Sequence, residues 1–320
     1  MTPLPQISTG SAPGKVILFG EHAVVYGQPA IAVPLNNLRA TATITAAGHS
    51  LEKLVVDAPG IAMHTSFDKL AEDHPLAAAI LETMRTLNIS EAPGGTLRVH
   101  SALPVAAGLG SSAAITIAIA RALAACFATE LPATAAAQIA SAVEHLHHGT
   151  SSGIDPTVIA HHAAICFTKY KDPEFIYPHS SLELAIADSG LTGSTREAVN
   201  AVRKLHSDSP DHFSSIFAEI GALAFSARAP LEAGKHEMLG ALMNANHSLL
   251  QAIGVSTALL DALCAAAIQA GAYGAKLTGA GTGGCMIALV DKPGAPNVQK
   301  ALLAAGAKSA SITTLESTTR

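Results

Sequence analysis

The chain has few aromatic and few charged side chains. Aromatic residues make up 4% of its 320 residues, Trp is absent, and charged residues make up 13%, whereas 49% of the chain is hydrophobic. A chain this apolar can bury a sizeable core, which argues against intrinsic disorder and predicts a core of Ala, Leu, Ile and Val. The net charge of −5 offers no broad basic surface, which argues against a nucleic-acid partner.

Cysteines are also scarce and widely separated. The four are Cys126, Cys166, Cys264 and Cys285, and no Cys-x-x-Cys pair occurs among them. This spacing predicts neither a zinc site nor a disulfide framework. We expect small buried thiols in a reducing compartment.

Export and membrane signals are missing from the sequence. A signal peptide has a basic region followed by an apolar one. The first five residues do not show this pattern. The most apolar run, 113–128, contains Arg121 and is shorter than a bilayer span. We therefore expect a cytoplasmic protein without a membrane partner, in which this run is a buried helix.

Hydrophobic periodicity predicts strands and helices in irregular alternation. Strands are expected at 15–19, 29–35, 40–46, 54–56, 97–100, 163–167, 184–187, 275–277, 286–290 and 309–314. Helices are expected at 75–87, 112–128, 133–148, 195–205, 214–227, 235–253 and 257–271. This mixture predicts an α+β fold in two lobes, 1–178 and 179–320, with the boundary in the polar stretch 171–181.

A glycine- and serine-rich loop, 104–113 (PVAAGLGSSA), directly precedes a predicted helix. Glycines allow a tight turn, and the N–H groups and dipole of the helix N-terminus attract an anion. The pattern indicates a phosphate site, at which the serine hydroxyls cap the helix or bind a metal. The alternative interpretation is an ordinary helix cap after a flexible turn.

A second segment, 12–22 (APGKVILFGEH), places charges beside an apolar strand. Lys15 opens that strand, where its ammonium could neutralise a phosphate or lower the pKa of a nearby hydroxyl. Glu21 and His22 follow at a glycine turn and could orient a polar substrate. The alternatives are an edge-strand lysine and a solvated turn.

A third segment, 144–155 (EHLHHGTSSGID), carries two carboxylates. Glu144 lies toward the end of a predicted helix, where the dipole disfavours a carboxylate and a bound cation would offset the penalty. Asp155 could take the proton of a substrate hydroxyl or form an ion pair with Lys15. Its alternative interpretation is an Asx turn before Pro156.

Two further features of the sequence bear on ligand binding. His145, His147 and His148 form no His-Glu-x-x-His pattern. A magnesium–phosphate site also prefers oxygen ligands, so we do not expect a histidine metal site. The loop 279–284 (GAGTGG) has too many glycines for an ordinary hairpin and could let the backbone approach a ligand closely.

Taken together, these segments resemble the GHMP small-molecule kinase family along nearly the whole chain. The resemblance rests on 13–27 (PGKVILFGEHAVVYG), 104–113, 276–285 (KLTGAGTGGC) and, on the substrate side, 188–195 (DSGLTGST). It implies a ribosomal-protein-like N-terminal lobe that carries ATP and a ferredoxin-like C-terminal lobe that closes the cleft. It also implies ATP-dependent phosphorylation, with the terminal hydroxyl of mevalonate as the expected acceptor.

The resemblance assigns roles to individual residues. The residues expected to bind ATP are Pro104, Ala107, Gly108, Leu109, Gly110, Ser111, Ser112, Ala113 and Gly281. Ser112 and Glu144 are expected to hold Mg²⁺. Asp155, assisted by Lys15, is expected to act on the acceptor hydroxyl as a base or an orienting group, and Glu21, His22 and Thr195 to position the substrate.

Two positions depart from the family pattern, and the first of them leaves the group that binds the substrate carboxylate unassigned. Gly193 stands two residues before Thr195, where animal enzymes often have a basic residue, and Tyr26 stands where they have histidine. The alternatives are phosphomevalonate, sugar or homoserine kinases, a diphosphomevalonate decarboxylase and a non-catalytic sensor. Few basic residues besides Lys15 and Arg196 lie in the motifs, which favours an unphosphorylated acceptor. The apolar composition is also compatible with a homodimer.

Overall fold

The computed structural model describes residues 5–47, 53–104, 108–148, 152–191 and 195–317. The chain forms two compact units, each built from separate stretches. The first comprises Met1–Gly14, Leu38–Leu103 and Gly110–His162, and the second comprises Lys15–Asn37, Pro104–Leu109 and Ala163–Arg320. Strands β1 (Ile7–Phe19) and β2 (Ala30–Ala46) contribute to both units. The division into lobes at 178/179 stays a prediction.

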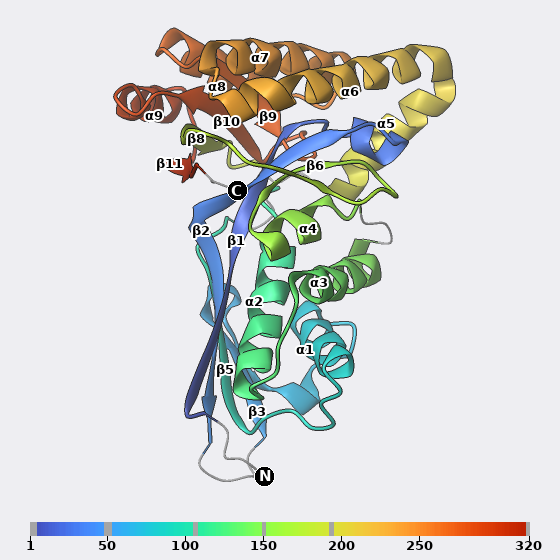
Figure 1. Cartoon of the computed structure of the whole chain (residues 1–320), viewed down its shortest axis with the longest axis vertical. Coiled ribbons are helices and arrows are strands. Elements are labelled where there is room, and N and C mark those ends of the chain that lie inside the picture. The colour runs from blue at the N-terminus through green and yellow to red at the C-terminus, as the bar shows by residue number, and fades with distance from the viewer. Residues whose placement is uncertain (1–4, 48–52, 105–107, 149–151, 192–194, 318–320) are drawn as a thin grey trace. The chain divides into compact units, whose positions relative to one another are not determined.

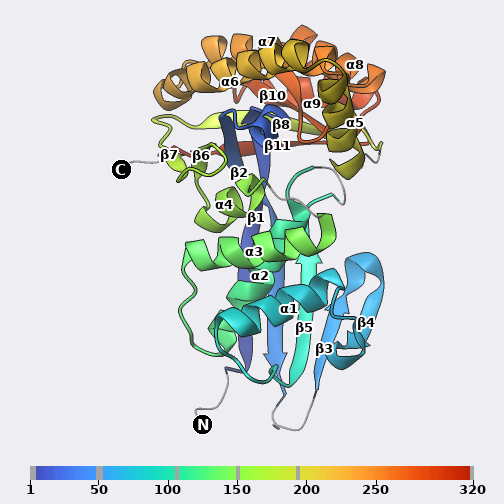
Figure 2. The same cartoon turned by 90° about the vertical axis from the view of Figure 1, so that its right-hand side faces the viewer.

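In the first unit, helices pack against a sheet. Its strands are β3 (Leu54–Ala58), β4 (Met63–Ser66), β5 (Gly95–Ser101) and the adjoining parts of β1 and β2. Its helices are α1 (Pro75–Thr86), α2 (Ser111–Cys126), α3 (Ala133–His148) and α4 (Ile154–His161), with short 3₁₀ turns η2 (Pro59–Ile61) and η3 (Phe67–Lys69). Figures 1 and 2 show α1, α2 and α3 on one face of this sheet. Helix α2 begins at Ser111, within the glycine- and serine-rich segment 104–113.

The second unit contains a four-stranded antiparallel sheet in the order β11-β8-β10-β9. Its strands are β8 (Leu182–Asp188), β9 (Gly274–Thr278), β10 (Cys285–Val290) and β11 (Ser309–Leu315). Its helices are α5 (Thr195–Asp208), α6 (Pro210–Ala233), α7 (His236–Ala252), α8 (Ala258–Gln269) and α9 (Ala295–Ala304). The strand order and the helical crossovers are those of a ferredoxin-like sheet, as expected.

Three short elements complete the second unit. The turn η1 (Ala23–Tyr26) follows β1, and β6 (Ala164–Phe167) pairs with both β2 and β7 (Glu174–Ile176). In η1, the Tyr26 ring stacks on Phe217 of α6 with centroids 4.2 Å apart. In a chain with so few aromatic residues, this contact fixes the segment that follows Glu21 and His22.

The prediction of separate strands at 29–35 and 40–46 was wrong, because β2 is one 17-residue strand. Its first residues pair with β6 in the second unit, and residues 40–46 pair with β5 in the first. The residues between the two predicted segments include Asn36 and Asn37, and asparagine is uncommon in strands. Pairing at both ends explains why the strand stays extended there, since strand propensity depends strongly on such context.

Several short elements were not predicted, namely β4, β7, α4 and α9. They have three to ten residues each, too few for a clear periodicity. The predicted end of α6 at 227 was also wrong, because the helix continues to Ala233 with Pro230 inside it. A proline close to a helix end disrupts fewer turns than one in the middle.

The core is aliphatic, as expected. The largest completely buried side chains are mostly Leu, Ile and Phe, with Lys276 as the one charged residue among them. All four cysteines are free thiols, three of them buried and Cys166 half-buried. Burial raises the pKa of both Cys264 and Cys285 to about 12. In the part of the chain that is described, no helix has both the length and the apolar character needed to cross a bilayer.

Candidate functional site

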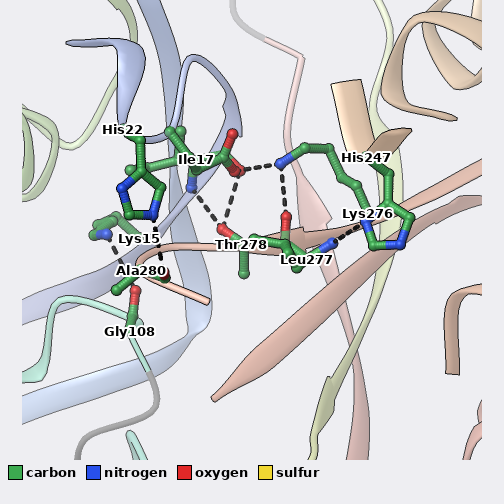
Figure 3. Close-up of polar contacts among 10 residues, drawn as sticks. Lys15, Ile17, His22, Gly108, His247, Lys276, Leu277, Thr278 and Ala280 are labelled. Atoms are coloured by element: carbon green, nitrogen blue, oxygen red, sulfur yellow. Dashed lines mark hydrogen bonds and ion pairs between the residues drawn. The ribbon is translucent and has the colours of Figure 1, made fainter. Parts of the chain in front are cut away.

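In the second unit, the end of β1 lies against the segment that begins with β9. Thr278 Oγ1 accepts a hydrogen bond from the Ile17 N–H at 3.1 Å and donates one to the Ile17 carbonyl at 3.0 Å (Figure 3). One side chain thus satisfies both backbone groups of a buried strand residue. The contact joins two of the glycine-rich motifs that the sequence separates by 261 positions.

Lys15 of β1 contacts the glycine- and serine-rich loop 104–113. Its Nζ donates to the Gly108 carbonyl at 3.1 Å, and its backbone N–H donates to the Leu109 carbonyl at 2.9 Å. The side chain is only 3% exposed. Gly108 and Gly110 have φ values of 77° and 74°, as the glycine-turn prediction requires. The buried ammonium therefore lies directly beside the loop expected to bind phosphate.

His22 is the central residue of a tight turn. The Ala23 N–H donates to the Glu21 carbonyl at 2.6 Å, and His22 has φ 60° and ψ −48°. These values approach a classic γ-turn, a rare and strained conformation that is associated with functional sites. His22 Nε2 lies 2.8 Å from the Ala280 carbonyl. Since a carbonyl only accepts, Nε2 carries the proton and Nδ1 is left as an acceptor.

Glu21 forms a completely buried ion pair with Lys276. Lys276 Nζ donates to Glu21 Oε1 and, at 2.7 Å, to the Leu277 carbonyl. Burial raises the pKa of Glu21, and the positive charges of Lys276 and Lys15 oppose that rise. Glu21 Oε2 has no hydrogen-bond partner among the described residues. In this structure the carboxylate faces the interior of the second unit and is not exposed.

The loop after β9 is held by backbone contacts on two sides. The Thr282 N–H donates to the Val255 carbonyl at 2.7 Å, and the Gly284 N–H donates to the Leu191 carbonyl at 2.8 Å. Gly281 has φ 71°, and a Cβ there would lie 2.1 Å from the Val255 carbonyl oxygen. A bare backbone at Gly281 is therefore a steric requirement.

We expect Gly281→Ala to lower kcat/KM for ATP by about 10²-fold, since the loop must move away from Val255 and a small misplacement at a reacting centre costs this much. Steady-state kinetics measures the change. Gly254→Ala is the matched control, because Gly254 has φ 77° but open space around a built Cβ. Equal effects of the two substitutions would contradict the steric explanation.

Two buried histidines link stability to pH. Burial lowers the pKa of His22, against the hydrogen bond to Ala280. Burial also lowers the pKa of His247 on α7, although the negative charge of Asp261 opposes it and the positive charge of Lys276 adds to it. Both histidines are therefore held neutral in the folded state, while in the unfolded state they protonate near pH 6.5.

A histidine whose pKa is lower in the folded state than in the unfolded state contributes to the free energy of unfolding above pH 6.5. That contribution is lost as the pH falls through the folded-state pKa. We therefore expect the melting temperature to fall steadily between about pH 7 and pH 5.5. His247→Gln should make this dependence shallower, since one titrating group is removed. Thermal melts by circular dichroism test this, and a melting temperature that is constant or rises toward acid would contradict it.

The remaining predicted residues lie mostly in the first unit. Ser111 and Ser112 begin α2, and Ala113 behind them is buried. Asp155 lies in the first turn of α4, where the helix dipole favours a carboxylate. Thr195 begins α5 of the second unit and is exposed. Ala107 and the residues just before Thr195 lie outside the described residues.

The first unit offers oxygen donors of the kind that a divalent cation prefers. Ser112 lies in the first turn of α2 and Glu144 lies on α3, and the two helices pack side by side. Among the described residues, no three His, Cys, Asp or Glu side chains form a metal cluster. Mg²⁺ needs no such cage, because it commonly uses one or two carboxylates together with substrate phosphates. The oxygen donors of Ser112 and Glu144 suit that mode.

The structure thus brings Lys15, Glu21, His22, Gly108 and Gly281 into one unit. Sequence reasoning missed Lys276 and Thr278 as members of this cluster. A signal was present for Lys276, since a lysine inside an otherwise apolar strand is as unusual as Lys15. Pairing across 255 positions could not be inferred from local sequence.

Comparisons with known proteins agree with this arrangement. Family models match residues 75–163 (GHMP kinases N terminal domain) and 227–308 (GHMP kinases C terminal). The mevalonate kinase of Pyrococcus abyssi is 40% identical over 302 residues, covering 89% of each chain.

Solved structures give the same result. The crystal structure of L. major mevalonate kinase in complex with R-mevalonate matches with a TM-score of 0.86 and 27% identity, covering 100% of this chain and 99% of that one. The Methanococcus jannaschii mevalonate kinase matches with a TM-score of 0.83 and 27% identity, covering 97% and 98%. The expected two-lobed α+β kinase fold is confirmed. The chain belongs to the GHMP kinase family and groups with its mevalonate kinases.

Proposed function

We infer that the chain transfers the γ-phosphoryl group of ATP to the terminal hydroxyl of mevalonate, giving phosphomevalonate and ADP. The observation that carries this inference is the meeting of the three family motifs in the second unit. There Lys15 contacts the Gly108 carbonyl, and Thr278 and Ala280 contact Ile17 and His22. The same acceptor is named for the relatives that match most of the chain.

The glycine loop and the start of α2 form the part of the proposed site that binds the phosphates of ATP. The first N–H groups of a helix have no intrahelical acceptor, and with the dipole they favour an anion. Gly110 is the residue before α2 and has a left-handed backbone. The loop from Pro104 to Ala113 would bind the ATP phosphates there, with Gly281 of the second glycine loop close to them.

Magnesium would be held by Ser112 and Glu144, both oxygen donors on helices of the first unit. When bound, the ion neutralises phosphate charge and aligns the transferred group. Phosphoryl transfer depends on alignment and charge neutralisation more than on covalent chemistry.

Four residues would act on the acceptor. Asp155 accepts the hydrogen bond of the mevalonate hydroxyl and takes its proton as the bond to phosphorus forms. The Lys15 ammonium stabilises the negative charge that develops on the transferred group. His22 presents Nδ1 as an acceptor toward a substrate hydroxyl, and Thr195 contributes a hydroxyl at the start of α5.

ADP release with mevalonate, phosphomevalonate, galactose and homoserine, measured in parallel, tests the assignment. We expect turnover with mevalonate alone, and only when Mg²⁺ is present. Turnover with a different acceptor would keep the phosphate side and overturn the acceptor. ATP binding without turnover on any acceptor would favour a sensor.

A further inference from the structure

The ion pair between Glu21 and Lys276 lies completely buried in the core of the second unit. Both side chains are 0% exposed. Removing two charges from water is costly, and replacing a buried pair by apolar side chains of similar volume often leaves a protein equally stable or more stable. The pair therefore calls for an explanation other than stability alone.

Lys276 lies on β9, which is an edge strand of its sheet. Edge strands leave outward N–H and C=O groups without a strand partner. At Leu277 both groups are taken up by side chains: its N–H donates to His247 Nδ1 at 3.3 Å, and its carbonyl accepts from Lys276 Nζ at 2.7 Å (Figure 3). The backbone is thus fixed directly before Thr278 and the glycine loop.

The contacts continue from His247 back to that loop. Because Nδ1 of His247 accepts a hydrogen bond, Nε2 carries the proton and donates to Asp261 Oδ1 at 3.1 Å. Ser256 Oγ donates to the same oxygen. The neighbouring Val255 carbonyl receives the Thr282 N–H at 2.7 Å. The base of the loop and its tip therefore depend on one connected set of polar contacts.

On the other side of the pair, Glu21 opens the strained turn at His22. Its own carbonyl closes that turn by accepting the Ala23 N–H. A strained backbone persists only where its surroundings hold it. The buried carboxylate supplies a fixed point one residue before His22, whose imidazole then reaches the Ala280 carbonyl.

We propose that Lys276 is a positioning residue for phosphoryl transfer, and that its buried pair with Glu21 fixes both the His22 turn and the glycine loop at 278–284. Glu21 then acts on the substrate through His22 and does not touch it. The proposal rests on the proposed function, because it assumes that His22 faces the acceptor and the loop faces ATP.

A double-mutant cycle tests the proposal with Glu21→Gln, Lys276→Met and the double variant. Lys276→Met leaves a buried carboxylate unpaired and should lower the melting temperature most. In the double variant no net charge is buried, so much of that loss should be recovered. We expect kcat of the folded double variant to stay about 10²-fold below wild type, as expected for misplaced reacting groups.

Asn244→Ala is the matched control. Asn244 Oδ1 accepts the Ala275 N–H at 2.8 Å, so it also supports β9, but at the end away from the glycine loop. This variant should melt at a lower temperature with kcat unchanged.

The outcomes separate the two proposals. Recovery of the melting temperature without recovery of kcat supports the positioning role. A folded double variant with wild-type kcat and KM would overturn the positioning role. Loss of folding in every variant of the pair would also overturn it. Either result would assign the pair to stability alone. Absence of mevalonate turnover in the wild-type protein would overturn the proposed function, whatever the melting temperatures show.

Discussion

Replacing Asp155 with Asn is expected to lower kcat by about 10²- to 10⁴-fold while ATP still binds, which is the range for a general base. The amide keeps the shape of the side chain but can neither take the proton of the acceptor hydroxyl nor hold a negative charge. Single-turnover ADP formation measures the chemical step, and nucleotide titration measures ATP binding.

A matched control distinguishes chemistry from helix stability. Asp155 lies in the first turn of α4, and Asp211 occupies the same kind of position in α6 and is exposed. Loss of either carboxylate costs about 0.3–1 kcal/mol of favourable interaction with the helix dipole. Asp211→Asn should therefore lower the melting temperature slightly and keep wild-type turnover. Near wild-type turnover in Asp155→Asn would refute the role of Asp155.

Lys15→Met is expected to lower kcat by about 10²- to 10³-fold, the range for loss of one group that stabilises transition-state charge. Methionine retains much of the apolar stem but lacks the ammonium that donates to the Gly108 carbonyl. Because this contact also supports the glycine loop, KM for ATP should rise. Steady-state kinetics with varied ATP separates the two effects.

Lys53→Met serves as the control for lysine removal, since Lys53 pairs with Asp68 at an exposed position. That variant should keep wild-type kcat and KM. Lys15→Met could instead retain wild-type kcat and raise only KM for ATP. That result would show that Lys15 binds ATP in the ground state, and it would contradict the proposal that Lys15 stabilises the transition state.

Much of the fold could be predicted because its long elements carry clear periodicity. The helix predicted at 75–87 is α1, and the helix predicted at 133–148 matches the bounds of α3. The continuous strand β2 could not be predicted, because its course across Asn36 and Asn37 depends on partners remote in sequence. Propensity describes local preference, and here pairing outweighs it.

Only part of the candidate site could be predicted from the sequence. Glycine positions such as Gly108 and Gly281 could be inferred, since their left-handed backbone is a local requirement. The burial of Glu21 against Lys276 could not, because a glutamate at a glycine turn suggests solvent exposure. Only the folded arrangement brings the lysine of β9 to that carboxylate.

The most direct test of the account is the identity of the product formed from mevalonate and magnesium–ATP, determined by phosphorus and proton NMR with ADP quantified in parallel. We predict one phosphomevalonate for each ADP, with the phosphate on the terminal primary oxygen. ADP formed without phosphorylated mevalonate, or phosphate on the tertiary hydroxyl, would contradict it.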